Sequence, residues 1–270
     1  MSSEIGLENG LLLLGCGKMG SALLDGWLGA GVPAHSIHVV EPRPSDWLKA
    51  AGTHLNEAIP ARADIALLAV KPQMMADALP ALRALGGGKT LFISIAAGTT
   101  IATLEAALGP ATPIVRVMPN TPAMVGRGIS GLVGNAHASA AEIAQARRLM
   151  QAVGEVVELE DEAQIDAVTA VSGSGPAYVF HLIEALAAAG EAEGLAPEVA
   201  MKLARATVCG AGELAFQSAE SAAQLRVNVT SPGGTTAAAL AVLMDPDTGF
   251  PPLLRRAVRA AADRGRELGR

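Results

Sequence analysis

The chain has 270 residues and a formal net charge of −6; half of its residues are hydrophobic and 17% are charged. This length is enough for one large domain or two ordinary ones with buried cores, and the acidic balance argues against a nucleic-acid-binding surface. The two cysteines, Cys16 and Cys209, are too few for a disulfide framework or a zinc site, so we expect a reducing, cytoplasmic setting and no metal.

The first part of the chain alternates short apolar runs with helical patterns. Its start is polar and acidic, which is not typical of a signal peptide. The apolar runs are continuous rather than alternating, as in parallel strands covered on both faces. We therefore predict an α/β fold with a doubly wound, mainly parallel sheet. The expected strands are 11–15, 37–41, 64–70, 90–96, 113–119, 128–135 and 154–160, with helices at 19–31, 100–109 and 139–153.

After Asp161 the sequence has the spacing of helices, and no strand is predicted. Apolar residues recur every three or four positions over 180–195, 197–216 and 251–268, with many alanines that permit close packing. No apolar run reaches the ~18 residues that a membrane span needs. The sequence predicts a dinucleotide-binding domain over 1–160 and an all-α domain over 161–270.

The first motif is a glycine-rich loop between an expected strand and an expected helix. It reads Gly15-Cys16-Gly17-Lys18-Met19-Gly20. In this pattern the first glycine permits a tight turn and the second lets a pyrophosphate approach the backbone. The third lets the helix pack closely on the strand, and the helix N-terminus attracts the phosphates. The strand–loop–helix setting favours a dinucleotide site over a plain glycine-rich turn.

The residues after the second expected strand bear on which dinucleotide is bound. Glu41 lies where a carboxylate would bind the 2′-hydroxyl of NAD, whereas Arg43 could pair with the 2′-phosphate of NADP. The two residues point to different cofactors. Each is equally well explained as a charge on a solvated loop.

Further candidates follow the next strands, at the edge of the sheet where ligands bind. Small residues, Ala96 and Ala97, would let a nicotinamide ribose lie against the backbone, and Lys71 either reaches a phosphate or is ordinary surface. Asn120 stands between two prolines; its amide either binds a carboxamide or ribose, or forms an Asx turn. These alternatives stay open.

The second motif, "VTSPGGTTAAAL" at 229–240, precedes an expected helix in the all-α half. Gly233 and Gly234 would leave main-chain N–H groups unobstructed, and Thr235 and Thr236 add hydroxyls. A helix N-terminus of this kind attracts anions, so we expect it to bind a substrate carboxylate. The alternative is a simple helix cap after a Pro-Gly turn. A second interruption, "SGSGP" within 171–186, should break or kink a helix.

Six motifs in order resemble one enzyme family. "GCGKMGSALL", "AVKPQ", "SIAAG", "RVMPNTPA", "SGSGPAYVF" and "SPGGTT" are similar to those of pyrroline-5-carboxylate reductases, over nearly the whole chain. The resemblance implies a Rossmann-type domain and a C-terminal all-α dimerisation domain. It implies reduction of 1-pyrroline-5-carboxylate to L-proline, the last step of proline biosynthesis, with NADPH or alternatively NADH. It also implies a homodimer of interleaved helices, with larger rings in some members.

The resemblance also assigns site residues. It places substrate contacts on Asn228, Thr235 and Thr236, and the second motif itself adds Ser231, Gly233 and Gly234 as candidates. It places cofactor contacts on Gly15, Cys16, Gly17, Lys18, Met19, Gly20, Asn56, Ala69, Val70, Lys71, Pro72, Ile95, Ala96 and Ala97. Glu41, Arg43 and Asn120 are cofactor candidates from their own positions, because the segment with Glu41 and Arg43 has no fixed family pattern. Thr230 stands where relatives often carry Ser or Cys, which weakens any role for that side chain as a nucleophile.

Thr236 is the expected catalytic residue, as a hydrogen-bond donor to the imine nitrogen. A threonine hydroxyl is a poor general acid, so we expect orientation or relay of a proton from water, while positioning supplies up to roughly 7–11 kcal/mol. Two other readings remain. A β-hydroxyacid dehydrogenase would need a Lys or similar acid/base in the helical half, where Lys202 is the only lysine. A non-catalytic NADP sensor would not need the second motif.

Overall fold

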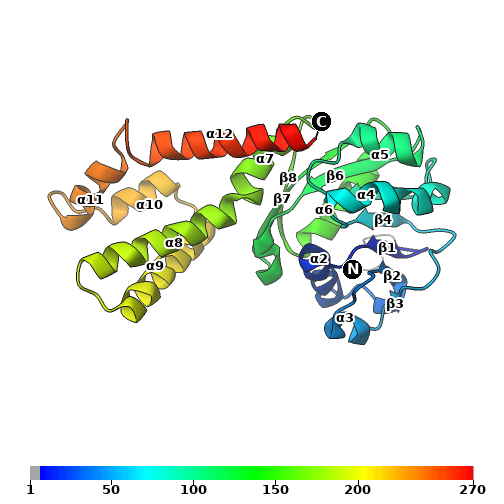
Figure 1. Cartoon of the computed structure of the whole chain (residues 1–270), viewed down its shortest axis with the longest axis horizontal. Coiled ribbons are helices and arrows are strands. Elements are labelled where there is room, and N and C mark those ends of the chain that lie inside the picture. Colours follow the sequence, from blue (N-terminus) through cyan, green and yellow to red (C-terminus); the bar gives the residue numbers. More distant parts are fainter. Residues whose placement is uncertain (1–6, 270) are drawn as a thin grey trace. The chain divides into compact units, whose positions relative to one another are not determined.

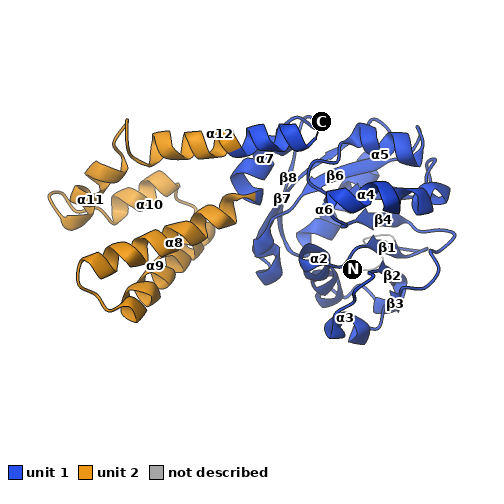
Figure 2. Cartoon of the chain, viewed as in Figure 1, with its two compact units in different colours: residues 1–173, 261–270 blue, residues 174–260 orange. Residues whose placement is uncertain are grey.

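The computed structural model describes residues 7–269 (Figure 1). The polar start of the chain, on which the signal-peptide expectation rests, lies mostly outside the described residues. The chain forms two compact units, one of residues 1–173 and 261–270 and one of residues 174–260 (Figure 2). The predicted limits of 1–160 and 161–270 for the two domains remain a prediction. Among the described residues, every helix is too short or too polar to cross a bilayer.

Unit 1 is built on an eight-stranded sheet with the order β3-β2-β1-β4-β5-β6-β7-β8. Neighbouring strands are parallel except for the antiparallel pair β6–β7. The predicted doubly wound, mainly parallel sheet is confirmed. The strands are β1 Leu11–Leu14, β2 Ile37–Val40, β3 His54–Leu55, β4 Ile65–Leu68, β5 Leu91–Ser94, β6 Ile114–Met118, β7 Gly128–Gly134 and β8 Gly154–Glu158.

Helices cover both faces of this sheet (Figure 1). Side chains along a strand alternate between the faces, and in β1 all four leucines are buried. Leu11 and Leu13 join the core beneath α2 and α6, and Leu12 and Leu14 join the core beneath α4 and α5. The unit 1 helices are α2 Lys18–Gly29, α3 Asp46–Ala50, α4 Pro72–Ala78, α5 Ile101–Leu108, α6 Ala140–Gln151 and α7 Gln164–Val168, with 3₁₀ turns Ala34–Ser36, Leu79–Leu85 and Thr121–Val125.

The described residues of unit 2 form helices joined by turns and loops, without a strand, as predicted. Helices α8 and α9 pack through small side chains, with Ala187, Ala200 and Ala204 buried beside Ile183. Many large apolar side chains stay exposed in the single chain; Phe180, for example, is 61% exposed. The helices are α8 Gly175–Ala192, α9 Pro197–Gln217, α10 Ala222–Asn228, α11 Thr235–Leu243 and α12 Phe250–Leu268, whose last residues belong to unit 1.

The interruption expected around "SGSGP" is a change of helix type. A π-helical segment, Thr169–Gly173, separates α7 from α8, and Pro176 lies in the first turn of α8. Proline is tolerated there because the first-turn N–H groups have no partner within the helix. The predicted break is therefore confirmed.

Candidate functional site: a dinucleotide loop and an uncapped helix

The three motif glycines of unit 1 have three different surroundings. Gly15 has φ +90°, and a Cβ there would lie 2.9 Å from the peptide that joins Ala69 to Val70. A Cβ on Gly20 would lie 2.5 Å from the Gly15 carbonyl oxygen. A Cβ on Gly17 would meet nothing within 4 Å. The fold therefore requires glycine at positions 15 and 20. At position 17 the fold would accept a side chain, so the glycine there leaves room for a ligand to approach the backbone.

That open space lies at the N-terminus of α2. Gly17 is the N-cap, no side chain caps the helix, and its first turn holds no acidic residue. Lys18 is exposed and Met19 half-buried. Unpaired N–H groups and the positive end of the helix dipole favour a phosphate here. The loop fits the pyrophosphate of a dinucleotide.

Glu41 is turned onto this loop. Its carboxylate accepts hydrogen bonds from the Cys16 N–H at 2.8 Å and from the Arg43 N–H at 3.0 Å. Asn56, at φ +53°, brackets the main chain of Glu41: its Oδ1 accepts from the Glu41 N–H at 2.8 Å and its Nδ2 donates to the Glu41 carbonyl at 2.9 Å. The structure thus brings Glu41, the predicted partner of the ribose hydroxyl, onto the glycine-rich loop.

Cys16 contributes its main chain rather than its thiol. The side chain is buried, and burial is the main cause that raises the pKa of the thiol, with the Glu41 charge adding to the rise. A hydrogen bond with Ser21 acts the other way. A thiol with a raised pKa stays protonated and unreactive at neutral pH.

The other predicted cofactor residues of unit 1 follow β4 and β5. The Ala69 N–H donates to the Leu14 carbonyl at 2.8 Å, which ties this strand end to the glycine-rich loop. Val70 is half-buried, Lys71 is the exposed N-cap of α4, and Pro72 is its first residue. After β5, Ile95 is half-buried, Ala96 buried and Ala97 exposed. These residues line the carboxyl edge of neighbouring strands, as predicted.

Asn120 is not free for a ligand in this structure. Its side chain is buried, donates from Nδ2 to the Ser172 carbonyl at 3.1 Å, and accepts at Oδ1 from the Ile129 N–H at 2.9 Å. These contacts join the end of β6 to the π-helical segment and to β7. They favour a positioning role over cofactor contact, and neither contact is the predicted Asx turn.

The second motif forms the start of α11 in unit 2. Gly233 has φ +70°, and the Gly234 N–H donates to the Ser231 carbonyl at 3.0 Å. Gly234 is the N-cap, and no side chain caps the helix. The hydroxyls of the motif therefore do not serve as a cap, and Thr235 and Thr236 occupy the first two helical positions.

Asn228, the last residue of α10, is held inside unit 2. Its Nδ2 donates to Glu220 at 2.9 Å and its Oδ1 accepts from Gln224 at 2.8 Å. Thr230 donates its hydroxyl to the Arg226 carbonyl at 2.6 Å, which leaves it no role as a nucleophile. The sequence analysis missed Glu220 and Gln224; spacings of eight and four from Asn228 are the only signal that would have found them.

A second missed contact is a buried ion pair in unit 1. Arg116 of β6 is 5% exposed and donates to Glu162 at 2.6 Å. The same carboxylate oxygen accepts from the Ile101 N–H, at the start of α5, at 2.8 Å. The pair thus anchors the loop that runs from Ile95 into α5.

Two family models match the chain. Residues 162–268 match the family described as pyrroline-5-carboxylate reductase dimerisation, and residues 11–98 match the family described as NADP oxidoreductase coenzyme F420-dependent. The match over the helical half, together with its exposed apolar side chains, supports a homo-oligomer.

Whole-chain relatives agree with these matches. The pyrroline-5-carboxylate reductase of Pseudomonas aeruginosa is 45% identical over 264 residues, which is 96% of each chain. A solved pyrroline-5-carboxylate reductase from Coxiella burnetii superimposes with a TM-score of 0.91 at 37% identity, over 97% of this chain and 99% of that one. The solved Plasmodium falciparum pyrroline carboxylate reductase with NADP bound superimposes with a TM-score of 0.82 at 32% sequence identity, over 97% of this chain and 99% of that one. The chain belongs to the pyrroline-5-carboxylate reductase family.

Proposed function

We propose that this enzyme reduces 1-pyrroline-5-carboxylate to L-proline with a hydride from NADPH, as the last step of proline biosynthesis. The observation that carries the activity is the 45% identity to the Pseudomonas aeruginosa reductase over 96% of each chain. The experiment that tests it is the oxidation of NADPH, followed by its absorbance, on addition of 1-pyrroline-5-carboxylate, with L-proline identified as product. NADH serves as the alternative donor in the same assay.

The cofactor site that supports this proposal is the glycine-rich loop of unit 1. The Gly15–Gly20 segment and the N-terminus of α2 would hold the pyrophosphate, Glu41 and Asn56 would define the ribose site, and Ala69–Pro72 with Ile95–Ala97 would line the nicotinamide side. Bound NADPH supplies the hydride. The protein's task there is to fix position and to exclude water.

The substrate site that supports it is the start of α11. The substrate is a cyclic imine with one carboxylate, and the Gly233 and Gly234 main chain with the uncapped helix end would bind that anion. Asn228, Ser231 and Thr235 would complete the contacts. Hydride transfer needs a positively polarised imine carbon, which protonation of the nitrogen provides. Thr236 would hold that nitrogen and relay a proton from water.

Replacing Thr236 should therefore lower kcat. We expect Thr236→Ala to reduce kcat roughly 10–100-fold with an unchanged KM for NADPH, because one hydrogen bond to a charged group is worth about 1.5–3 kcal/mol. Thr236→Ser keeps the hydroxyl and should retain most of the activity. Steady-state kinetics of the three proteins measure this. A Thr236→Ala enzyme with parental kcat would exclude a catalytic role for Thr236.

Arg43 should set the preference for NADPH. A guanidinium–phosphate contact on an exposed loop is worth about 1.4 kcal/mol, so Arg43→Ala should raise the KM for NADPH about tenfold and leave that for NADH unchanged. Arg62→Ala is the matched control. Arg62 precedes β4 and so lies at the amino ends of the strands, whereas Arg43 follows β2 at the carboxyl ends. Equal effects on the two cofactors would contradict the 2′-phosphate contact.

Assembly and location complete the proposal. The enzyme forms a homodimer through interleaved helices of unit 2, and such dimers join into a ring; light scattering after size-exclusion chromatography measures the mass. Cytoplasmic location is supported by the two unpaired cysteines, of which Cys209 is exposed in the single chain.

A further inference from the structure

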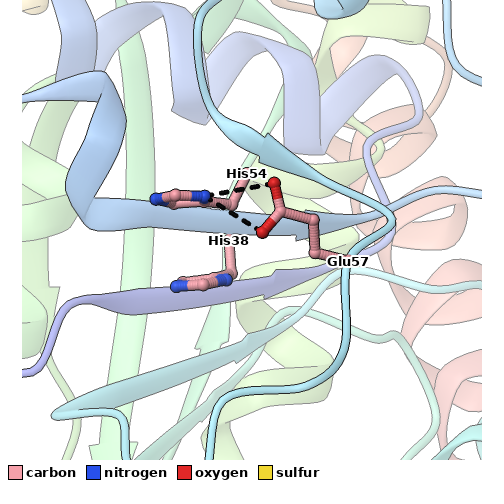
Figure 3. A group of neighbouring side chains, drawn as sticks. All are labelled: His38, His54 and Glu57. Carbon is pink, nitrogen blue, oxygen red and sulfur yellow. Dashed lines mark hydrogen bonds and ion pairs between the residues drawn. The ribbon is translucent and has the colours of Figure 1, made fainter.

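Three side chains with metal-binding atoms meet at the edge of the sheet in unit 1. They are His38 of β2, His54 of β3 and Glu57 of the loop that follows (Figure 3). One ligand atom from each lies within 4.8 Å of the other two. Within residues 7–269 this is the only such group of three or more His, Cys, Asp or Glu side chains. None of the three has a role in the proposed reaction.

The backbone brings the two histidines together. His38 and His54 are direct partners in the parallel pair β2–β3, so their side chains leave the same face of the sheet. Their rings are stacked, with centroids 4.5 Å apart and an interplanar angle of 16°. Glu57 closes the group, since both of its carboxylate oxygens lie 3.2 Å from His54 Nδ1 (Figure 3).

His38 contains an unsatisfied polar atom in this group. Its Nδ1 is buried and has no hydrogen-bond partner. Most buried polar atoms in native proteins have a hydrogen-bond partner or a ligand, and a bound water or a bound ion would supply one here. Burial lowers the pKa of His38, and the neighbouring His54 lowers it further, although Glu57 acts the other way.

We propose that His38, His54 and Glu57 bind one Zn²⁺ ion, with water as the fourth ligand. Imidazole and carboxylate are established ligands of this ion, and a single carboxylate leaves a site of modest net charge. The sequence analysis expected no metal because it considered cysteines, and the spacing of these three residues matches no familiar zinc motif.

The geometry requires a small adjustment. Tetrahedral donors 2.0–2.2 Å from zinc lie roughly 3.4 Å apart, and the three ligand atoms lie within 4.8 Å of one another, so the most distant pair must close by at most about 1.4 Å. The lone pairs of stacked rings run nearly parallel, so one ring must also tilt. The His54 and Glu57 side chains are 40% and 58% exposed and are free to make this movement, whereas His38 is more enclosed.

Zinc here would join the shortest strand of the sheet, β3, to its neighbour β2. β3 has two residues, and two residue pairs join it to β2. Asn56, which brackets the Glu41 main chain, lies between the two ligands of this segment. Binding should therefore raise the thermal midpoint of unit 1.

Titration of the metal-free full-length enzyme with zinc chloride at pH 7.5, by calorimetry and thermal melting, tests the proposal. We expect one Zn²⁺ per chain, and a higher Tm with zinc. Glu57→Gln and His54→Asn should each weaken binding at least tenfold, whereas His137→Asn, an exposed histidine of the same unit, should not. Glu57→Gln is the safer variant for folding, because that side chain is mostly exposed.

Cobalt(II) supplies a second readout. Its visible spectrum should indicate a four-coordinate site without thiolate, and the signal should vanish in the Glu57→Gln, His54→Asn double variant. The proposal is overturned if the parental enzyme binds no more zinc than that double variant, or if Cys209→Ser abolishes the binding.

Discussion

Gly17→Ala is expected to raise the KM for NADPH about 10–100-fold while it changes the free energy of unfolding by less than about 1 kcal/mol. A Cβ at position 17 would meet no protein atom within 4 Å, so the fold has room for it. The same Cβ would stand in the space where the pyrophosphate must approach the backbone. Steady-state kinetics and thermal melting of the same preparation measure the two effects.

Alanine at two further glycines of α2 provides the controls for this experiment. Gly29→Ala, at the end of the same helix, also has nothing within 4 Å and should leave the KM for NADPH unchanged. Gly20→Ala places a Cβ 2.5 Å from the Gly15 carbonyl oxygen, so stability and cofactor affinity should both fall. An unaltered KM in the Gly17 variant would mean that the dinucleotide does not approach this turn.

Glu162→Ala should destabilise unit 1 by about 3 kcal/mol, because it leaves the guanidinium of Arg116 buried without a carboxylate. The loss of stability is smaller than for a completely buried pair, because the Glu162 side chain is 30% exposed and water can reach the site. The substitution also removes the acceptor of the Ile101 N–H. Urea unfolding, followed by tryptophan fluorescence, reports on this unit because both tryptophans, Trp27 and Trp47, belong to it.

Glu160→Ala is the matched control, since that residue is exposed two positions away and should change stability by less than about 0.5 kcal/mol. The double variant Arg116→Met, Glu162→Leu should recover part of the lost stability, because a well-packed apolar pair can replace a buried ion pair. If Glu162→Ala costs no more than the control, the ion pair contributes nothing measurable.

The parts of the fold that could be predicted are those with repeated local signals. Leu11–Leu14 is apolar at every position because both faces of the strand are buried, and the same holds for Ile65–Leu68. These runs placed the main strands within a few residues. The glycine-rich loop was predictable because its backbone geometry admits only glycine at positions 15 and 20, so the loop leaves a recognisable spacing of glycines in the sequence.

What escaped prediction depends on partners far along the chain. β3 has two residues and is defined by its pairing with β2, and two residues are too few to form an apolar run that predicts a strand. The partners of Asn120 lie nine and 52 positions away, which left its role open between two readings. Nothing in the even helical spacing of 251–268 indicated that the end of α12 belongs with the sheet.

That shared helix has a consequence for biosynthesis. Unit 1 takes its last piece, residues 261–270, from beyond unit 2 in the sequence; there Ala262 is buried and a Cβ on Gly98 would lie 3.0 Å from the Leu268 carbonyl. Residues 261–270 are synthesised after the whole of unit 2, which spans residues 174–260. The nucleotide-binding half, though begun first, can thus be completed only after unit 2 has been translated.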